Sequence, residues 1–229
     1  MKKLSLLFTK DGLQWHISKG KTVLEEAFHF VTEETSPHLV EQKLDEILKF
    51  DDYKEIEVIS ALNHFSLTPD TFAEHELGYK LISYNAPVDE ANEELMLSVN
   101  KKFAVQFYYT FPKHFYQKIK AKKLPTKFNF SGEKFLNALT VKNHKEIHIN
   151  LYHHQVEFFA FENKKVVLYN NLDADSEVDF LYFIMFSLSK INFGTAETHF
   201  HIYGETHENE TFISELKKFV KNIKLKDAG

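Results

Sequence analysis

The hydrophobic and polar positions of this chain alternate in short runs, and these runs predict a succession of strands and helices. Near the N-terminus, residues 4–8 and 13–17 are two apolar runs separated by Asp11 and Gly12. An Asp-Gly pair between two such runs is typical of a two-residue hairpin turn, where positive φ angles are needed. We therefore predict a β-hairpin, and a third short strand that follows Gly20 and includes Val23 and Leu24.

The next segment predicts a helix followed by a strand. Its apolar residues recur at helical spacing; they are Leu39, Val40, Leu44, Ile47 and Leu48. A strand is predicted at residues 56–62, and a short apolar run stops at Pro69. Residues 77–127 are less regular, with an acidic segment at 89–94 that suits a loop or a helix start and a strand at 103–109. Pro112 suits the first turn of a helix, and Ser131 suits the N-cap of another.

The final third repeats the order of the first. Strands are predicted at residues 147–151, 156–161 and 166–169, with a turn at Asn163-Lys164. A helix capped by Asp175 or Ser176 runs to about residue 190 and is followed by a strand at 198–203. A last helix begins near Asn209, and its apolar residues are Phe212, Ile213, Leu216, Phe219, Val220 and Ile223. Because both ends show three strands, a helix and a strand, we predict an internal duplication.

The helix at residues 178–188 is apolar nearly all round. A helix of this kind must be covered on more than one side. We therefore expect it to lie between a sheet and another layer, near the contact of the two halves.

Composition excludes several classes of protein. The chain has 229 residues, and 43% of them are hydrophobic, which is enough for a substantial core. It has no cysteine, so cysteine-based zinc sites, thiol nucleophiles, iron–sulfur clusters and disulfides are excluded. All 28 basic residues are lysine and the net charge is −5, which argues against nucleic acid as a partner.

The same composition guides the expected location. The apolar run at the N-terminus is too short for a signal peptide. The most apolar stretch, residues 180–188, is much shorter than the roughly 20 residues needed to cross a bilayer. We expect a cytoplasmic protein without a membrane span.

Three segments resemble those of one uncharacterised bacterial family, domain-of-unknown-function family 3822. They are LSLLFTKDGLQWHI, IEVISALNHFSLTPDTF and VVLYNNLDADSEVDFLYFIMFSLSKINF. The resemblance covers about residues 4–223 and implies an α/β, actin-like ATPase (ribonuclease H-like) fold with no assigned activity. That fold has two duplicated halves, each with a mixed sheet flanked by helices. We place the halves at residues 1–100 and 101–229, and leave open whether elements of 101–141 belong to the first.

The resemblance also implies where a nucleotide would bind. Actin-like ATPases carry an Asp two residues before a Gly in the first hairpin of each half. Here Lys10 holds that position and Asp11 is directly beside Gly12, while the second hairpin at residues 152–155 has neither Asp nor Gly. The adenosine-binding turn usually has paired glycines, and only Gly204 is present. Because a nucleotide cradle needs backbone close to phosphate, we predict that Asp11, Gly12 and Gly204 are relics of that machinery.

A metal site is a second candidate. His199 and His201 are two residues apart on a predicted strand, so they share a face, with Glu197 beside them. Two histidines and a carboxylate can hold zinc. Further histidines on a neighbouring strand could add to the set; these are His148, His153 and His154. The alternative is a polar sheet face that is rich in histidine.

No Ser/His/Asp arrangement or carboxylate pair stands out, so we predict no catalytic residue and no cofactor. The first hypothesis for function is a non-catalytic protein-interaction or scaffold module with an unknown protein partner. The alternative is a nucleotide-binding protein or weak ATPase with atypical phosphate loops. A third hypothesis is a metal-dependent enzyme centred on His199 and His201. The oligomeric state is left open.

Overall fold

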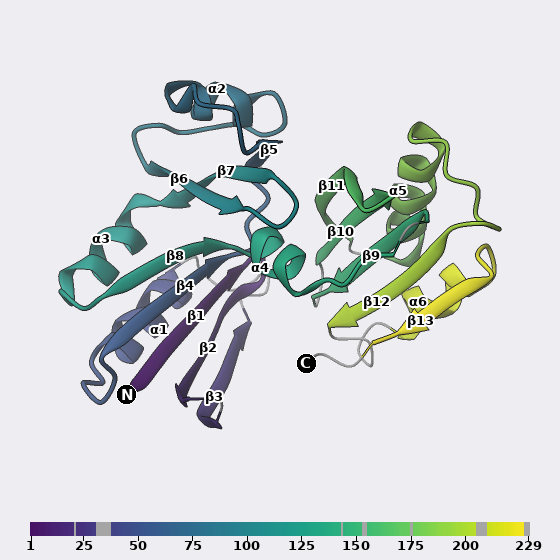
Figure 1. Cartoon of the computed structure of the whole chain (residues 1–229). Helices are drawn as coiled ribbons and strands as arrows, with labels where there is room; N and C mark the ends of the chain where they lie inside the picture. Colours follow the sequence, from purple (N-terminus) through teal and green to yellow (C-terminus); the bar gives the residue numbers. More distant parts are fainter. Residues whose placement is uncertain are drawn as a thin grey trace. The chain divides into compact units, whose positions relative to one another are not determined.

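The structure is a computed structural model of the whole chain (Figure 1). It describes residues 1–20, 22–30, 38–142, 144–152, 155–174, 176–204 and 210–226, without the side chains of 26–30. The chain divides into two compact units, Met1–Lys134 and Phe135–Gly229. The elements between residues 105 and 130, which the sequence left open, belong to the first unit.

The first unit is built on a five-stranded mixed sheet in the order β3-β2-β1-β4-β8. Strands β1 and β2 form the predicted hairpin, but its turn lies one residue earlier than predicted. Thr9 pairs with Gly12, so the two turn residues are Lys10 and Asp11, and the positive φ falls on Gly12 in β2. Strands β1, β4 and β8 are parallel to one another. The bounds are β1 Lys2–Thr9, β2 Gly12–Lys19, β3 Thr22–Phe30, β4 Glu55–Ser60 and β8 Thr126–Phe130.

Helices α1 (His38–Leu48) and α3 (Lys113–Ala121) complete the core of this unit. Alternate residues of β1 and β2 are buried, as are the apolar residues of the two helices that pack with them. These include Leu4, Leu6, Leu13, Trp15, Leu44, Ile47, Phe115 and Ile119. The helical spacing and the proline at the start of α3 therefore predicted both helices correctly.

A three-stranded antiparallel sheet, in the order β5-β7-β6, is inserted between β4 and α3. Its elements are β5 Phe65–Pro69, η1 His75–Leu77, α2 Gly78–Ser83, β6 Glu93–Asn100 and β7 Val105–Pro112. The acidic segment at 89–94 runs into β6, which the sequence pattern did not predict. Most of β6 is only half-buried, so charged and apolar residues mix along it without strict alternation.

The second unit repeats the first, with strand order β11-β10-β9-β12-β13 and the same directions. Its strands are β9 Glu146–Leu151, β10 Gln155–Glu162, β11 Lys165–Asp173, β12 His199–Gly204 and β13 Asn222–Leu225. The predicted turn at Asn163-Lys164 is confirmed, and both residues have positive φ, 51° and 66°. Two mixed sheets of identical topology confirm the predicted fold class and its duplicated halves (Figure 1).

Helices α5 (Glu177–Lys190) and α6 (Glu210–Lys217) cover the apolar face of this sheet. Inward residues of α5 are buried against both the sheet and α6; they are Phe180, Ile184 and Leu188. A further helix, α4 (Ser131–Ala138), links the units along the chain, and its Phe135 contacts the rings of Phe159 and Tyr203.

Two further expectations were wrong. The last helix ends at Lys217 and does not continue to Ile223, which lies in β13. The backbone tightens there, because the amides of Lys218 and Phe219 bond to carbonyls three residues back. Val220 and Ile223 still pack on the core, so the apolar spacing imitates a longer helix.

The second error concerns α5. We expected it to lie between a sheet and another layer. The sheet and α6 cover its inner side, but the opposite side is exposed at Val178, Tyr182 and Phe186.

Candidate functional site

The first predicted phosphate position is the β1–β2 turn. Gly12 is the first residue of β2, with φ of 145°, and pairs with Thr9, so Asp11 occupies the tip of the hairpin. In the second unit the amide of Tyr152 donates to the carbonyl of Gln155 across the corresponding turn. His153 and His154 lie outside the described residues, as does Asp175.

Gly204 has a structural reason to be glycine. It ends β12 with φ of 81°, a conformation that side chains rarely adopt. A Cβ atom there would lie 2.2 Å from the carbonyl oxygen of Leu151 and 2.7 Å from Oδ1 of Asn150. The close approach of β12 to β9 therefore explains this glycine without a nucleotide.

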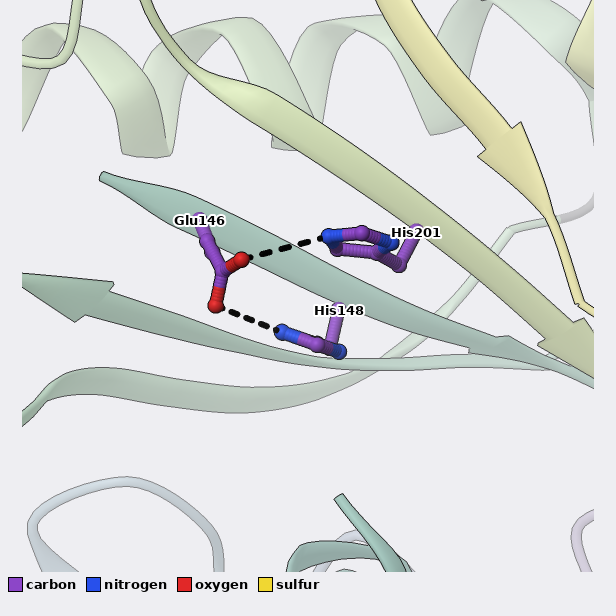
Figure 2. Close-up of side chains that lie close together, drawn as sticks. All are labelled: Glu146, His148 and His201. Atoms are coloured by element: carbon purple, nitrogen blue, oxygen red, sulfur yellow. Dashed lines mark hydrogen bonds and ion pairs between the residues drawn. The ribbon is translucent and has the colours of Figure 1, made fainter. Parts of the chain in front are cut away.

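The polar residues of unit 2 gather on the sheet face opposite α5 and α6. Strands β9 and β12 are parallel, and His148 pairs in register with His201. Because side chains alternate along a strand, Glu146 and His148 point to the same face as His201. Figure 2 shows the three side chains converging, and we call them the Glu–His cluster.

The carboxylate of Glu146 stands between the two imidazoles. Its Oε2 lies 3.4 Å from Nε2 of His148, and its Oε1 lies 3.4 Å from Nε2 of His201 (Figure 2). The same carboxylate accepts a hydrogen bond from the backbone amide of Lys142 at 2.9 Å. Nε2 of His144 lies 3.0 Å from Oε1. The cluster is buried, with Glu146 and His148 each 1% exposed and His201 9% exposed.

Burial sets the protonation of the cluster. Desolvation, reinforced by the nearby His201, lowers the pKa of His148 to about 4. Desolvation also lowers the pKa of His201. Burial by itself would raise the pKa of Glu146, but hydrogen bonds from the Lys142 amide and from His148 outweigh it and lower that pKa. At neutral pH the cluster therefore holds a carboxylate and two neutral imidazoles.

Tyr203 supports the cluster from β12. Its hydroxyl lies 3.0 Å from Nδ1 of His148, and the two rings stack with centroids 5.9 Å apart. Burial raises the pKa of Tyr203 to about 12, so the phenol keeps its proton. The hydroxyl therefore orients the His148 ring, with Nε2 directed at Glu146.

The structure brings together only part of the predicted metal set. His201 belongs to the Glu–His cluster, while the ring of His199 packs on His144 with centroids 4.3 Å apart. Glu197 is paired with Lys145 at 2.8 Å instead. The sequence reasoning missed Glu146. The available signal was the placement of His144, Glu146 and His148 at alternate positions at the start of β9.

A second feature is the outer face of α5, which we define as Val178, Tyr182 and Phe186 with Asp179 and Lys190. The three apolar side chains are 73%, 60% and 48% exposed, and they follow one another at intervals of four residues. The rings of Tyr182 and Phe186 stack at 5.7 Å, and Nζ of Lys190 lies 4.9 Å from the Phe186 ring centroid. Large apolar side chains gathered on one helix face are the usual mark of an interaction surface.

The two mixed sheets of the same strand order, each covered by helices, define a protein with an actin-like ATPase fold. The family model described as "Protein of unknown function (DUF3822)" matches residues 1–223, so the chain belongs to that family. No curated protein matches. Within the described residues, no helix has both the length and the apolar character needed to cross a membrane.

Solved structures share the fold. A Bacteroides thetaiotaomicron protein with actin-like ATPase fold and unknown function is 21% identical, with a TM-score of 0.82 over 98% of this chain and 90% of that one. The PilM–PilN type IV pilus biogenesis complex gives 11% identity and a TM-score of 0.64 over 98% and 88%. The cytoplasmic domain of EpsL, an inner membrane component of the Vibrio cholerae type II secretion system, gives 8% identity and 0.57 over 100% and 90%.

Proposed function

We propose that this chain is a non-catalytic protein-interaction module that acts as a scaffold by pairing with a second copy through the outer face of α5. The observation that carries this proposal is the exposure of Val178, Tyr182 and Phe186 on one side of a helix whose other side is core. We place the module in the cytoplasm, a setting that a chain without cysteine suits.

The apolar part of the outer face of α5 is large enough for a small protein–protein interface. Residues 178–186 span about 12 Å of helix axis. Burial of apolar surface contributes about 25 cal/mol per Å², so covering three large side chains favours association. The stacked rings of Tyr182 and Phe186 also lose little freedom on binding, because they already contact each other.

The charges at the two ends of the stripe favour a second copy in antiparallel orientation. Asp179 lies near the N-terminal end of α5, and Lys190 is its last residue. When two α5 helices pack antiparallel, Asp179 of one chain approaches Lys190 of the other, and the reciprocal pair forms at the other end. A two-fold axis near residue 184 thereby places Tyr182 and Phe186 of one chain against the same residues of the other.

The fold comparisons are compatible with this role. One neighbour is a complex of two pilus biogenesis proteins, and another is a component of a secretion system. An actin-like fold therefore occurs in assemblies. The charge of this chain favours protein as the partner over nucleic acid, since its net charge is −5 and it has no arginine.

Analytical ultracentrifugation over a range of concentrations tests the pairing. We expect a reversible monomer–dimer equilibrium with a dissociation constant on the order of 10 μM, as suits a small interface. The double variant Tyr182→Glu/Phe186→Glu should stay monomeric. The matched control is Tyr84→Glu, which changes a tyrosine that is 72% exposed in the other unit and should leave the equilibrium unchanged. A wild-type chain that stays monomeric at 200 μM would contradict the proposal.

A charge exchange tests the orientation. Asp179→Lys and Lys190→Asp should each weaken the dimer several-fold, because each places like charges together at both ends. The two changes combined should restore it, since the opposite charges again meet. If the combined variant is weaker than either single variant, the antiparallel arrangement is wrong.

Nucleotide binding is the second candidate function, favoured by the position of Asp11 at the tip of the first hairpin with Gly12 directly after it. Calorimetric titration with ATP and Mg²⁺ separates it from the first. Saturable micromolar binding that is lost in Asp11→Ala would establish nucleotide binding. A wild-type chain that gives no heat of binding would exclude this function.

A further inference from the structure

We infer that Glu146, His148 and His201 form a binding site for a divalent first-row transition-metal ion, of the class that mixed imidazole and carboxylate ligands hold. Zn²⁺ is the simplest representative of this class. The site lies on the sheet face opposite α5, so it is separate from the outer face of α5.

The distances within the cluster are long for hydrogen bonds and fit metal coordination. The contacts from Nε2 of His148 and Nε2 of His201 to the Glu146 carboxylate both measure 3.4 Å. N–H···O hydrogen bonds measure roughly 2.7–3.2 Å. Ligand atoms about 2.0–2.1 Å from Zn²⁺ lie about 3.4 Å apart in a tetrahedral site. The three candidate ligand atoms all lie within 4.8 Å of one another. Small side-chain rotations would therefore bring the remaining ligand–ligand distance to the spacing of a tetrahedral site.

The ligand types suit a cation. A carboxylate and two imidazoles each present a lone pair, and first-row transition-metal ions bind such mixed ligand sets. The parallel pairing of β9 with β12 brings these three groups together on one sheet face (Figure 2).

Outer groups hold the ligands in orientation. The Tyr203 hydroxyl contacts Nδ1 of His148 and leaves Nε2 as the atom directed at the site. The Lys142 amide donates to Glu146 on the other side. Partners of this kind are typical of metal centres, where they set the tautomer and the ring direction. His144, 36% exposed at its side chain and 3.0 Å from Glu146, lies where solvent or an ion can reach the cluster.

The alternative is a buried hydrogen-bonded cluster without an ion. Buried ionisable groups cost stability unless they are well paired. The contacts of Glu146 to the two cluster histidines are long, and Nδ1 of His201 has no hydrogen-bond partner within the described part of the chain. An ion bound between the three groups would compensate the carboxylate charge and offset this cost.

The test uses the full chain without a polyhistidine tag, after dialysis against a chelator. Titration with Zn²⁺ by calorimetry should give one ion per chain, and Co²⁺ should give the intense visible bands of a four-coordinate site. Glu146→Gln and His201→Asn should each weaken Zn²⁺ binding at least 100-fold. The matched control is His199→Asn, on the same strand as His201, which should change the affinity less than threefold.

Stability measurements keep the test decisive if a variant folds poorly. Circular dichroism reports folding, and saturating Zn²⁺ should raise the Tm of the wild-type chain but not that of Glu146→Gln. Tyr203→Phe keeps every ligand and should weaken Zn²⁺ about tenfold, with an altered Co²⁺ spectrum, because Tyr203 is a positioning residue. Absence of wild-type binding at 100 μM Zn²⁺, or binding that persists in both ligand variants, would overturn the inference.

Discussion

Glu57 is the clearest case in unit 1 of a single residue whose charge matters to the fold. It lies on β4, and its carboxylate accepts hydrogen bonds from Lys3 on β1 and Lys134 on α4, each at 2.7 Å. Asn129 on β8 adds a third at 3.1 Å. Burial alone would raise the pKa of Glu57, but the lysines outweigh it and lower the pKa to about 2. Glu57 therefore connects three strands and a helix through one ionised group.

This arrangement predicts a pH dependence. The folded pKa of about 2 lies below the reference value of 4.5. The stabilisation is therefore complete above pH 4.5 and is lost as the pH falls toward 2. We expect Glu57→Gln to lower the free energy of unfolding by about 2–3 kcal/mol at pH 7. Urea titrations of both chains between pH 7 and pH 2.5 measure this, and the difference should shrink across that window. A constant difference would contradict the assignment.

Two glycines with positive φ form a matched pair for a second prediction. Gly204 has φ of 81° and faces the backbone of Leu151, whereas Gly20 has φ of 64° and no atom within 4 Å of the position that a Cβ would take. Gly20→Ala should cost about 1 kcal/mol for the backbone conformation alone. Gly204→Ala should cost about 3 kcal/mol or more, because strand β12 must also move away from β9. Chemical denaturation of both variants checks the difference, and equal costs would show that β12 relaxes freely.

At the scale of the element, the start of α5 depends on Ser176. Its hydroxyl oxygen accepts a hydrogen bond from the Asp179 amide at 3.2 Å, and its hydroxyl donates to the Asp179 carboxylate at 2.7 Å. We expect Ser176→Ala to lower the free energy of unfolding by about 1 kcal/mol, the usual cost of a lost N-cap. The control is Ser189→Ala in the last turn of α5, where the hydroxyl donates only to a carbonyl of its own helix. Its effect should stay within about 0.5 kcal/mol, and thermal unfolding measures both.

The elements that the sequence predicted well have strong local signals. The hairpin near Asp11 and Gly12, the proline before α3 and the cap at Ser176 each depend on signals within a few residues, so the pattern alone identifies them, with the hairpin turn displaced by one residue. Strand β13 has no such signal. Only its pairing with β12 makes Asn222–Leu225 a strand, and no nearby residue encodes that pairing.

The candidate site was predictable only in part for the same reason. The spacing of His199 and His201 showed that they share a strand face. Which strand lies beside them depends on sheet order, and that order brings His148 and Glu146 to His201 from more than fifty positions away. The alternate positions of His144, Glu146 and His148 were visible in the sequence, but only the parallel pairing of β9 with β12 shows that Glu146 and His148 meet His201.

At the scale of the whole molecule, each unit has its own core. Ile47 of α1 and Ile184 of α5 occupy corresponding helices of the repeat, and each is 1% exposed. The two clusters of buried residues share no member.

Because the cores are separate, a core substitution in one unit should destabilise that unit and leave the other unit's stability unchanged. Ile47→Ala and Ile184→Ala should each cost about 2–4 kcal/mol through the cavity left behind. Hydrogen exchange followed by mass spectrometry should show faster exchange in residues 1–134 for the first variant and in 135–226 for the second. Equal acceleration throughout the chain in either variant would mean that the whole molecule unfolds as one cooperative unit.

The inserted three-stranded sheet also has a consequence for how such a chain can change. It enters between β4 and α3, the junction that corresponds to the one between β12 and α6. Strand β4 still pairs with β8 just as β12 pairs with β13. The repeated framework is therefore the same in both units, although residues 61–112 separate β4 from α3 and only residues 205–209 separate β12 from α6. A chain with two matching halves can in this way be asymmetric while both halves keep the same strand order.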